Sequence, residues 1–197
     1  MTDTTAPPPR ALPPNPAVPE RIAIDEFQLR RYAREDVEAL HEAIKAGYAE
    51  IHLWMPWCVA PIKIEDQREF VEETFTRWAT GEAFNFGIFD ADERLIGAIS
   101  LMDRVGPGGL EIGYWVAREH TGRGIATAAA AALTEAALGL PGIERTEIVH
   151  DLSNAASGQV PRKLGYARAG TAVGRFPRAP GECGTSAIWR LVRPAAG

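Results

Sequence analysis

Cysteine and histidine are scarce in this chain, with two cysteines and four histidines among 197 residues. Cys58 and Cys183 are too few for a disulfide framework, and the histidines do not combine with them at zinc-ligand spacing, so no structural metal is expected. No uninterrupted apolar stretch approaches the roughly 18 residues that a membrane helix needs. Residues 1–20 have neither the basic start nor the apolar segment of a secretory leader. We therefore expect no membrane association and a cytoplasmic location.

Positively charged residues are also fewer than negatively charged ones: the chain has 21 Lys and Arg and 26 Asp and Glu, which gives a net charge of -5. Broad nucleic-acid binding relies on Lys and Arg to neutralise phosphates, so no nucleic-acid partner is expected. A single phosphate-bearing ligand is still compatible with this charge. Hydrophobic residues make up 46% of the chain and charged residues 24%, the mixture of one globular domain.

Proline is concentrated at the start of the chain, where seven of the fifteen precede residue 20. Each proline ring removes a backbone donor and blocks both a helix and an inner strand. We predict a disordered tail over 1–20 and a single domain over 21–197.

From residue 21 onward, apolar periodicity alternates between strand and helix patterns. The predicted strands are 22–29, a hairpin over 84–102, 110–116, 144–150, 168–173 and 186–192. The predicted helices are 35–48, 64–80, 125–138 and 155–164, with a loop over 51–61. This order is not the regular alternation of a doubly wound sheet.

The most informative segment is a strand that ends in a glycine-rich turn and then a helix. The first N–H groups of a helix have no internal partners and the helix dipole is positive there, so the turn predicts an anion site without any lysine. Gly122 and Gly124 remove side chains that would block a phosphate, and Ala126 does so partly.

Three ligand classes match this pattern. A Walker site needs Gly-Lys-Ser/Thr at the helix start, which GRGIAT lacks. A dinucleotide site needs GxGxxG and an acidic residue at the end of the next strand, but Thr127 replaces the third glycine and Glu144 precedes its strand. We rank NAD or ATP below the third class, coenzyme A.

Two segments, EIGYWVAREHTGRGIATAA and SNAASGQVPRKLGYARAGT, occur in this order and resemble the GCN5-related N-acetyltransferase (GNAT) family. WMPW and GAISL are similar to its branch of ribosomal-protein N-terminal acetyltransferases, the RimJ/RimL-like branch. The resemblance covers about residues 22–192. It implies an α/β (α+β) GNAT fold: a mixed, mostly antiparallel twisted sheet of about seven strands, helices on both faces, and a splayed parallel pair that binds acetyl-CoA.

The resemblance also implies the positions that bind the acetyl-CoA co-substrate. The family's Gln/Arg-x-x-Gly-x-Gly/Ala pattern falls on Thr121, Gly124 and Ala126, and Thr121 departs from it. Backbone N–H groups would hold the pyrophosphate, with Arg123 as a charge at the rim. The main chain of Trp115 and Val116 would lie along the acetyl-pantetheine end. The other expected binding residues are Thr121, Gly122, Arg123, Gly124, Ile125, Ala126 and Asn154.

Acetyl transfer requires a deprotonated amine, hence a base or a water chain. Glu111, on the strand face of Trp115, is the candidate, and an ordinary structural hydrogen bond is the alternative. The leaving thiolate benefits from a hydroxyl donor, and the helix over 155–164 has no tyrosine for this. The branch motif Asn-x-x-Ser matches Asn154 and Ser157, which implies that Asn154 orients the cofactor arm and Ser157 donates to the thiolate. Both residue types also cap helices.

The acceptor is expected near the loop over 51–61, where Trp54 and Trp57 are predicted to bind substrate and packing over the core is the competing interpretation. Cys58 lacks a matching Cys-His-acid arrangement, so direct attack in a ternary complex is expected. The predicted activity is acetylation of a protein N-terminal α-amine. The alternatives are acetylation of a small amine (an antibiotic, polyamine or amino acid) and a CoA-binding module without activity. The resemblance also allows a homodimer.

Overall fold

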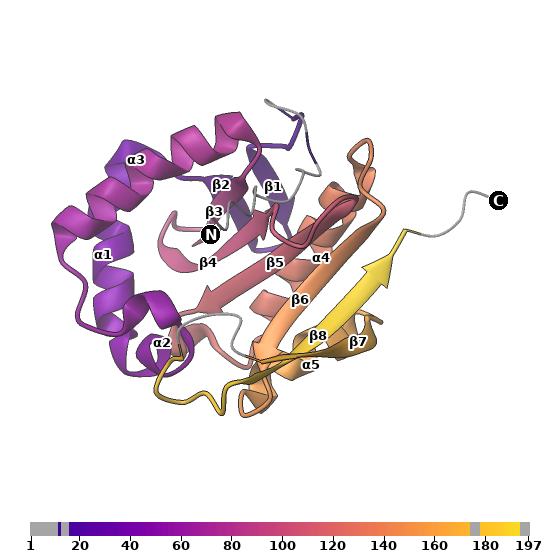
Figure 1. Ribbon diagram of the computed structural model, residues 1–197. Helices are drawn as coiled ribbons and strands as arrows, with labels where there is room; N and C mark the ends of the chain where they lie inside the picture. Colours follow the sequence, from indigo (N-terminus) through magenta and orange to yellow (C-terminus); the bar gives the residue numbers. More distant parts are fainter. Residues whose placement is uncertain (1–11, 13–15, 174–177, 194–197) are drawn as a thin grey trace, which may run out of the picture.

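The structure is a computed structural model that describes residues 12, 16–173 and 178–193 (Figure 1). Its strands form one eight-stranded sheet in the order β1-β2-β3-β4-β5-β6-β8-β7. Neighbouring strands are antiparallel except for β5 and β6, which are parallel. The predicted mixed sheet is confirmed, with eight strands instead of about seven. The strands are β1 (Arg21–Ile24), β2 (Phe27–Arg31), β3 (Ala83–Asp90), β4 (Leu95–Met102), β5 (Gly109–Val116), β6 (Arg145–Asp151), β7 (Ala167–Val173) and β8 (Thr185–Val192).

The additional strand arises from the stretch predicted as one strand over 22–29. Asp25 adopts φ 44°, and the chain reverses there, so that Ile24 of β1 lies opposite Phe27 of β2. Aspartate tolerates this left-handed conformation better than most residues. The prediction of a single strand was wrong because apolar residues continue through the turn.

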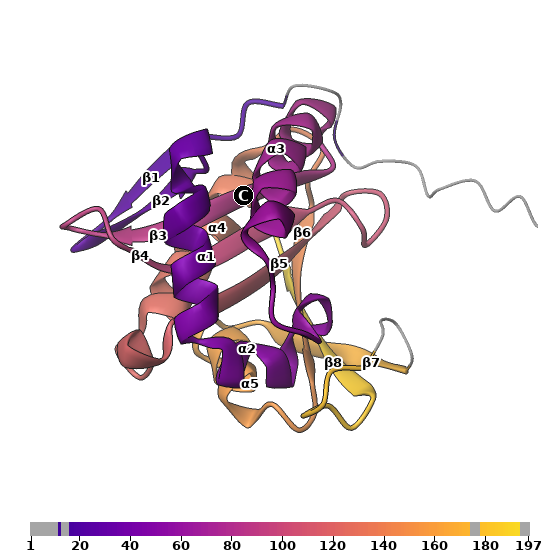
Figure 2. The same ribbon diagram turned by 90° about the vertical axis from the view of Figure 1, so that its left-hand side faces the viewer.

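Helices cover both faces of the sheet. α1 and α3 lie on one face, and α4 lies on the other together with α5 (Figure 2). The α-helices are α1 (Val37–Ala46), α2 (Tyr48–Trp54), α3 (Ile64–Thr80), α4 (Ile125–Gly139) and α5 (Ala155–Lys163), and the short 3-10 helices are η1 (Arg34–Asp36), η2 (Pro56–Cys58) and η3 (Arg118–His120).

The predicted helix over 35–48 and the loop after it differ from the structure. The first α-helix ends at Ala46, and Gly47 leaves helical geometry with φ -93° and ψ 10°. A second helix, α2, then begins at Tyr48, within what was predicted as helix and loop. The short break at Gly47 lets α2 change direction across the end of the sheet.

The core lies between the sheet and these two helical layers. Side chains on one face of β5, including Leu110 and Ile112, are buried in the main core cluster with α4, whereas Trp115 packs on the side of α1 and α3. Most of the predicted tail lies outside the described residues. Its described part includes Leu12 and Val18, which are buried against the main core cluster because their apolar side chains lose contact with water there.

The described residues contain no helix long and apolar enough to span a bilayer. They also contain no group of three or more His, Cys, Asp and Glu side chains arranged to hold a metal ion.

Candidate active site

The parallel strands β5 and β6 separate halfway along their length. Their ladder stops at Ile112 opposite Ile148, and beyond it β5 pairs with β4 while β6 pairs with β8. The second half of β5 is correspondingly less buried than the first. We call the gap between residues 113–116 of β5 and 149–151 of β6 the wedge.

Main-chain groups of β5 point into the wedge where the partner strand has moved away. The N–H of Ala117 donates to the Ile96 carbonyl beside β4 at 2.9 Å. Because main-chain groups alternate sides along a strand, those of Trp115 also point to β4, whereas those of Tyr114 and Val116 point into the wedge. Trp115 and Val116 were both predicted to meet the ligand through their main chain, but only Val116 directs its N–H into the wedge, where it is open to an added, strand-like ligand.

The glycine turn follows β5 and ends at the N-terminus of α4. Gly122 and Gly124 have φ of 75° and 82°, the left-handed region that favours glycine, and a Cβ on either would meet nothing within 4 Å. Within the part of the chain that the structure describes, the N–H groups of residues 122–127 donate to no protein oxygen. An open cradle of unused donors at a helix N-terminus fits a pyrophosphate.

Polar side chains close the turn and connect it to the rest of the fold. The Thr121 hydroxyl donates to the Arg118 carbonyl at 2.8 Å, so this side chain stabilises the turn itself. Arg123 lies exposed at the rim, 3.1 Å from a ring nitrogen of His120. The guanidinium of Arg118 pairs with Glu50 of α2 at 2.7 Å, which joins the turn to the helix on the other side of the site.

The first turn of α5 lies against β6. Asn154 caps this helix, because its side-chain oxygen accepts the N–H of Ser157 at 3.0 Å, and its predicted role as a cap is confirmed. A Cβ on Gly158 would lie 2.9 Å from the His150 ring of β6, so only glycine lets the helix approach this closely. The Ser157 side chain is therefore held at the edge of the wedge.

Sequence reasoning missed one hydroxyl at this place. The Tyr114 hydroxyl of β5 lies 3.1 Å from the carbonyl oxygen of Ser157 and 3.3 Å from its Oγ. Tyr114 was predicted only as part of the strand over 110–116, with no role in the site. The two residues are 43 positions apart, and no local pattern signals a contact of this kind.

Glu111, the predicted base, is buried on the opposite face of β5. Its side chain accepts a hydrogen bond from Arg104 at 2.6 Å. Directly across the parallel ladder lies Glu147, which is held by Arg190 at 2.8 Å. Two carboxylates thus lie side by side near the base of the wedge, each paired with an arginine.

The predicted acceptor residues lie at the end of α2. The N–H of Gly181 donates to the Leu53 carbonyl at 2.9 Å. A Cβ on Gly181 would lie 2.7 Å from that carbonyl and 3.2 Å from the Trp54 ring, so the loop over 178–184 packs closely on α2. Trp54 lies at this junction, whereas Trp57 is 50% exposed.

Asp151, at the end of β6, holds the same loop from the other side. Its carboxylate accepts three main-chain hydrogen bonds, from Ser153 at 2.8 Å, Cys183 at 3.0 Å and Gly184 at 2.9 Å. Burial alone would raise the pKa of this carboxyl, but the three donors outweigh burial and lower its pKa to about 2. The charged carboxylate therefore ties the start of α5 to the loop that contacts α2.

We predict that Asp151→Asn lowers the free energy of unfolding by about 2 kcal/mol at neutral pH. Because the folded-state pKa of Asp151 is below its unfolded value, the carboxylate stabilises the fold above about pH 4. That stabilisation is lost as the pH falls from about 4 towards 2. Urea unfolding of both proteins at several pH values measures the difference, which should shrink over this interval.

Asp92→Asn is the charge-matched control, because Asp92 is 74% exposed in its side chain and forms only a surface ion pair with Arg94. Its effect should stay within about 0.5 kcal/mol at every pH. A difference for Asp151→Asn that does not depend on pH would contradict the assigned cause.

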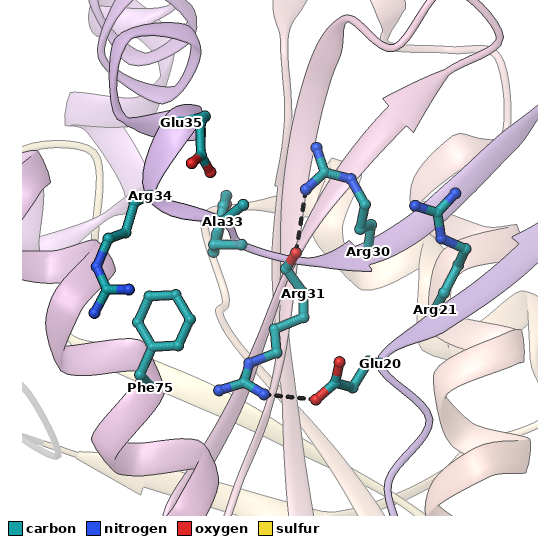
Figure 3. A pocket seen from close by; sticks show the side chains of 9 residues that line it. Glu20, Arg21, Arg30, Arg31, Ala33, Arg34, Glu35 and Phe75 are labelled. Carbon is teal, nitrogen blue, oxygen red and sulfur yellow. Dashed lines mark hydrogen bonds and ion pairs between the residues drawn. The ribbon is translucent and has the colours of Figure 1, made fainter.

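One hollow in the described part of the chain is lined by Arg30, Arg31 and Phe75 among others (Figure 3). It has a volume of about 500 Å³ and lies at the end of β2, three strands from β5. Three of its four arginines pair with carboxylates: Arg31 with Glu20, Arg30 with Asp36 and Arg34 with Glu72. Because the hollow lies away from the wedge and the glycine turn, we do not assign it to the active site.

Comparisons with known proteins agree with this geometry. The chain resembles solved acetyltransferase structures, including RimL ribosomal L7/L12 α-N-protein acetyltransferase in complex with coenzyme A (TM-score 0.81, 22% identity, 90% of this chain and 100% of that chain). Another is the microcin C7 self-immunity acetyltransferase MccE with acetyl-CoA and AMP (TM-score 0.77, 22% identity, 86% and 93%). The fold is thus that of an acetyltransferase.

Sequence comparisons give the family. The model described as Acetyltransferase (GNAT) domain matches residues 26–167. The ribosomal-protein-serine acetyltransferase of Escherichia coli (strain K12) is 31% identical over 150 residues, which cover 75% of this chain and 83% of the relative. The chain belongs to the GNAT family, as its motifs predicted, and it is an N-acetyltransferase with acetyl-CoA as co-substrate.

Proposed function

We propose that this enzyme acetylates the α-amino group of a protein N-terminus by direct attack on acetyl-CoA in a ternary complex. The observation that carries the proposal is the wedge, which lies between a pyrophosphate cradle and a face with buried carboxylates. The E. coli relative, named for a ribosomal-protein serine, supports a protein acceptor.

The residues of this chain divide between the two substrates. The N–H groups of residues 122–127 would bind the pyrophosphate. The N–H of Val116, at the open edge of β5, would donate to the thioester carbonyl, where negative charge develops as the amine attacks. Acetyl-CoA supplies the activated acetyl group and a thiolate leaving group.

Glu111 would receive the proton of the incoming ammonium, directly or through water, and so release the lone pair that attacks. Ser157 would donate a hydrogen bond to the departing thiolate. Cys58 is fully buried, and burial raises the pKa of its thiol, which favours direct attack over an acyl-cysteine intermediate.

A substrate scan tests the acceptor. Purified protein with acetyl-CoA is assayed for thiol release against short peptides with free N-termini, the same peptides with blocked N-termini, and small amines. We expect turnover of the peptides with free N-termini and none of the blocked peptides. The kcat/KM of the free peptides should be at least about tenfold above that of any small amine, because a peptide contacts more of the acceptor face.

Each result of the scan has a distinct meaning. Turnover confined to a polyamine, an amino acid or an aminoglycoside would replace the protein acceptor with a small amine. Tight binding of acetyl-CoA in calorimetry without turnover of any amine would indicate a module that binds CoA without activity.

A further inference from the structure

The Tyr114 hydroxyl links the two sides of the wedge. Tyr114 belongs to β5, and Ser157 to the first turn of α5, which packs on β6. The hydroxyl donates to the Ser157 carbonyl at 3.1 Å and lies 3.3 Å from Ser157 Oγ. Both oxygens of one residue, the main-chain and the side-chain oxygen, therefore meet the same tyrosine hydroxyl.

The sequence of α5 explains why the Ser157 carbonyl is available. In an α-helix this carbonyl would accept the N–H of residue 161, four positions later. Residue 161 is Pro161, inside α5, and proline has no N–H. Tyr114 supplies the donor that Pro161 lacks.

This arrangement also determines what the Ser157 hydroxyl can do. When the Tyr114 O–H donates to the carbonyl, the tyrosine oxygen still has lone pairs that accept the O–H of Ser157. A thiolate is a charged acceptor and forms a stronger hydrogen bond than a neutral phenol does. The Ser157 O–H would turn to a thiolate in the wedge by rotation about Cβ–Oγ, with no movement of heavier atoms.

Resting on the proposed function, we propose that Tyr114 is a positioning residue that holds Ser157 and aims its hydroxyl at the sulfur of acetyl-CoA. In this step the amine nitrogen forms a bond to the acetyl carbon, and the carbon–sulfur bond breaks with its electron pair on sulfur. Ser157 keeps its proton and donates a hydrogen bond to the thiolate. The thiolate takes its proton from water after release, and the proton lost by the amine leaves through Glu111 or water.

Tyr114 remains a donor throughout the working pH range. Burial raises its pKa to about 12, despite the opposing effect of its contact with Ser157. Its loss should consequently lower kcat by the same factor from about pH 6 to 9 without moving the pH profile.

The test is a double-mutant cycle with Tyr114→Phe and Ser157→Ala, assayed with acetyl-CoA and the best acceptor from the scan. Tyr114→Phe should lower kcat about tenfold, and KM for acetyl-CoA should change less than about twofold, because the hydrogen bond matters for the thiolate more than for the bound ground state. Ser157→Ala should lower kcat by a larger factor. In the double variant, Tyr114→Phe should cause no further loss, since it acts through Ser157.

Pro161→Ala separates the positioning role from a structural role. Alanine restores an N–H to the Ser157 carbonyl. If Tyr114 only satisfies that carbonyl, the Tyr114→Phe/Pro161→Ala variant regains the wild-type kcat, and the proposal is overturned. We expect the loss in kcat to persist in this variant, even where its melting temperature recovers.

Tyr166→Phe is the matched control, because Tyr166 is a buried tyrosine whose hydroxyl contacts Thr134 at 2.6 Å and Thr146 at 2.7 Å. It should lower stability and leave kcat unchanged. Additive losses in the cycle, or an equal loss of kcat in Tyr166→Phe, would overturn the role of Tyr114 but leave the proposed function standing. A wild-type protein that binds acetyl-CoA and acetylates no amine would overturn the proposed function together with this role.

Discussion

We expect Glu111→Gln to lower kcat about 100-fold and to leave the dissociation constant for acetyl-CoA unchanged. Glutamine keeps the shape of the side chain but cannot accept the proton of the acceptor ammonium, and a general base contributes about 10² to 10⁴ in rate. Steady-state kinetics with saturating acetyl-CoA measures kcat, and calorimetry measures the dissociation constant. The loss should become smaller at high pH, where the acceptor amine is already neutral.

Glu147→Gln is the matched control for this prediction. Glu147 lies directly across the ladder from Glu111, is also buried, and also pairs with an arginine. Its replacement should cost stability and change kcat only a few-fold. Equal losses in both variants, or a Glu111→Gln loss that does not diminish with an acceptor amine of low pKa, would assign Glu111 to the fold instead of the chemistry.

Gly124→Val should raise the dissociation constant for acetyl-CoA about 100-fold, which corresponds to about 2.7 kcal/mol. The φ of 82° at Gly124 is strained for a β-branched residue. The new side chain would project into the open space in front of the turn, where the pyrophosphate is expected. Calorimetric titration with acetyl-CoA measures the change directly.

Gly142→Val is the matched control for Gly124→Val, because it introduces the same backbone strain at a glycine outside the site. Gly142 has φ 79°, and a Cβ there would also meet nothing within 4 Å, but it lies in the turn before β6. This variant should lose stability and keep the wild-type affinity. If Gly124→Val binds acetyl-CoA as tightly as the wild type, the turn is not the pyrophosphate site.

The parts of the site that depend on neighbouring residues were predictable. Strand β5, the glycine turn and α4 lie close together along the chain, with only the short helix η3 between β5 and the turn. Hydrophobic alternation favours the strand, glycine favours the turn and alanine favours the helix. The cap at Asn154 is likewise local, because its partner Ser157 is three residues away. For such features, propensity and spacing carry enough information.

The parts that depend on distant contacts were not predictable. The partner of Tyr114 lies 43 residues along the chain, and the loop that rests on α2 contacts Leu53 through Gly181. Hydrophobic periodicity does not predict which residues of a strand and of a distant helix come into contact. The break at Gly47 was missed for another reason. The apolar spacing of α1 continues to Tyr48, so the change in helix direction does not alter the pattern.

The proline in α5 has a consequence for how this site can change in evolution. A relative with an ordinary residue at the position of Pro161 would have a complete helical hydrogen-bond ladder, and its Ser157 carbonyl would need no donor from β5. The position of Tyr114 would then be released from that constraint. We therefore expect these two positions to covary among relatives, with tyrosine retained where proline is retained.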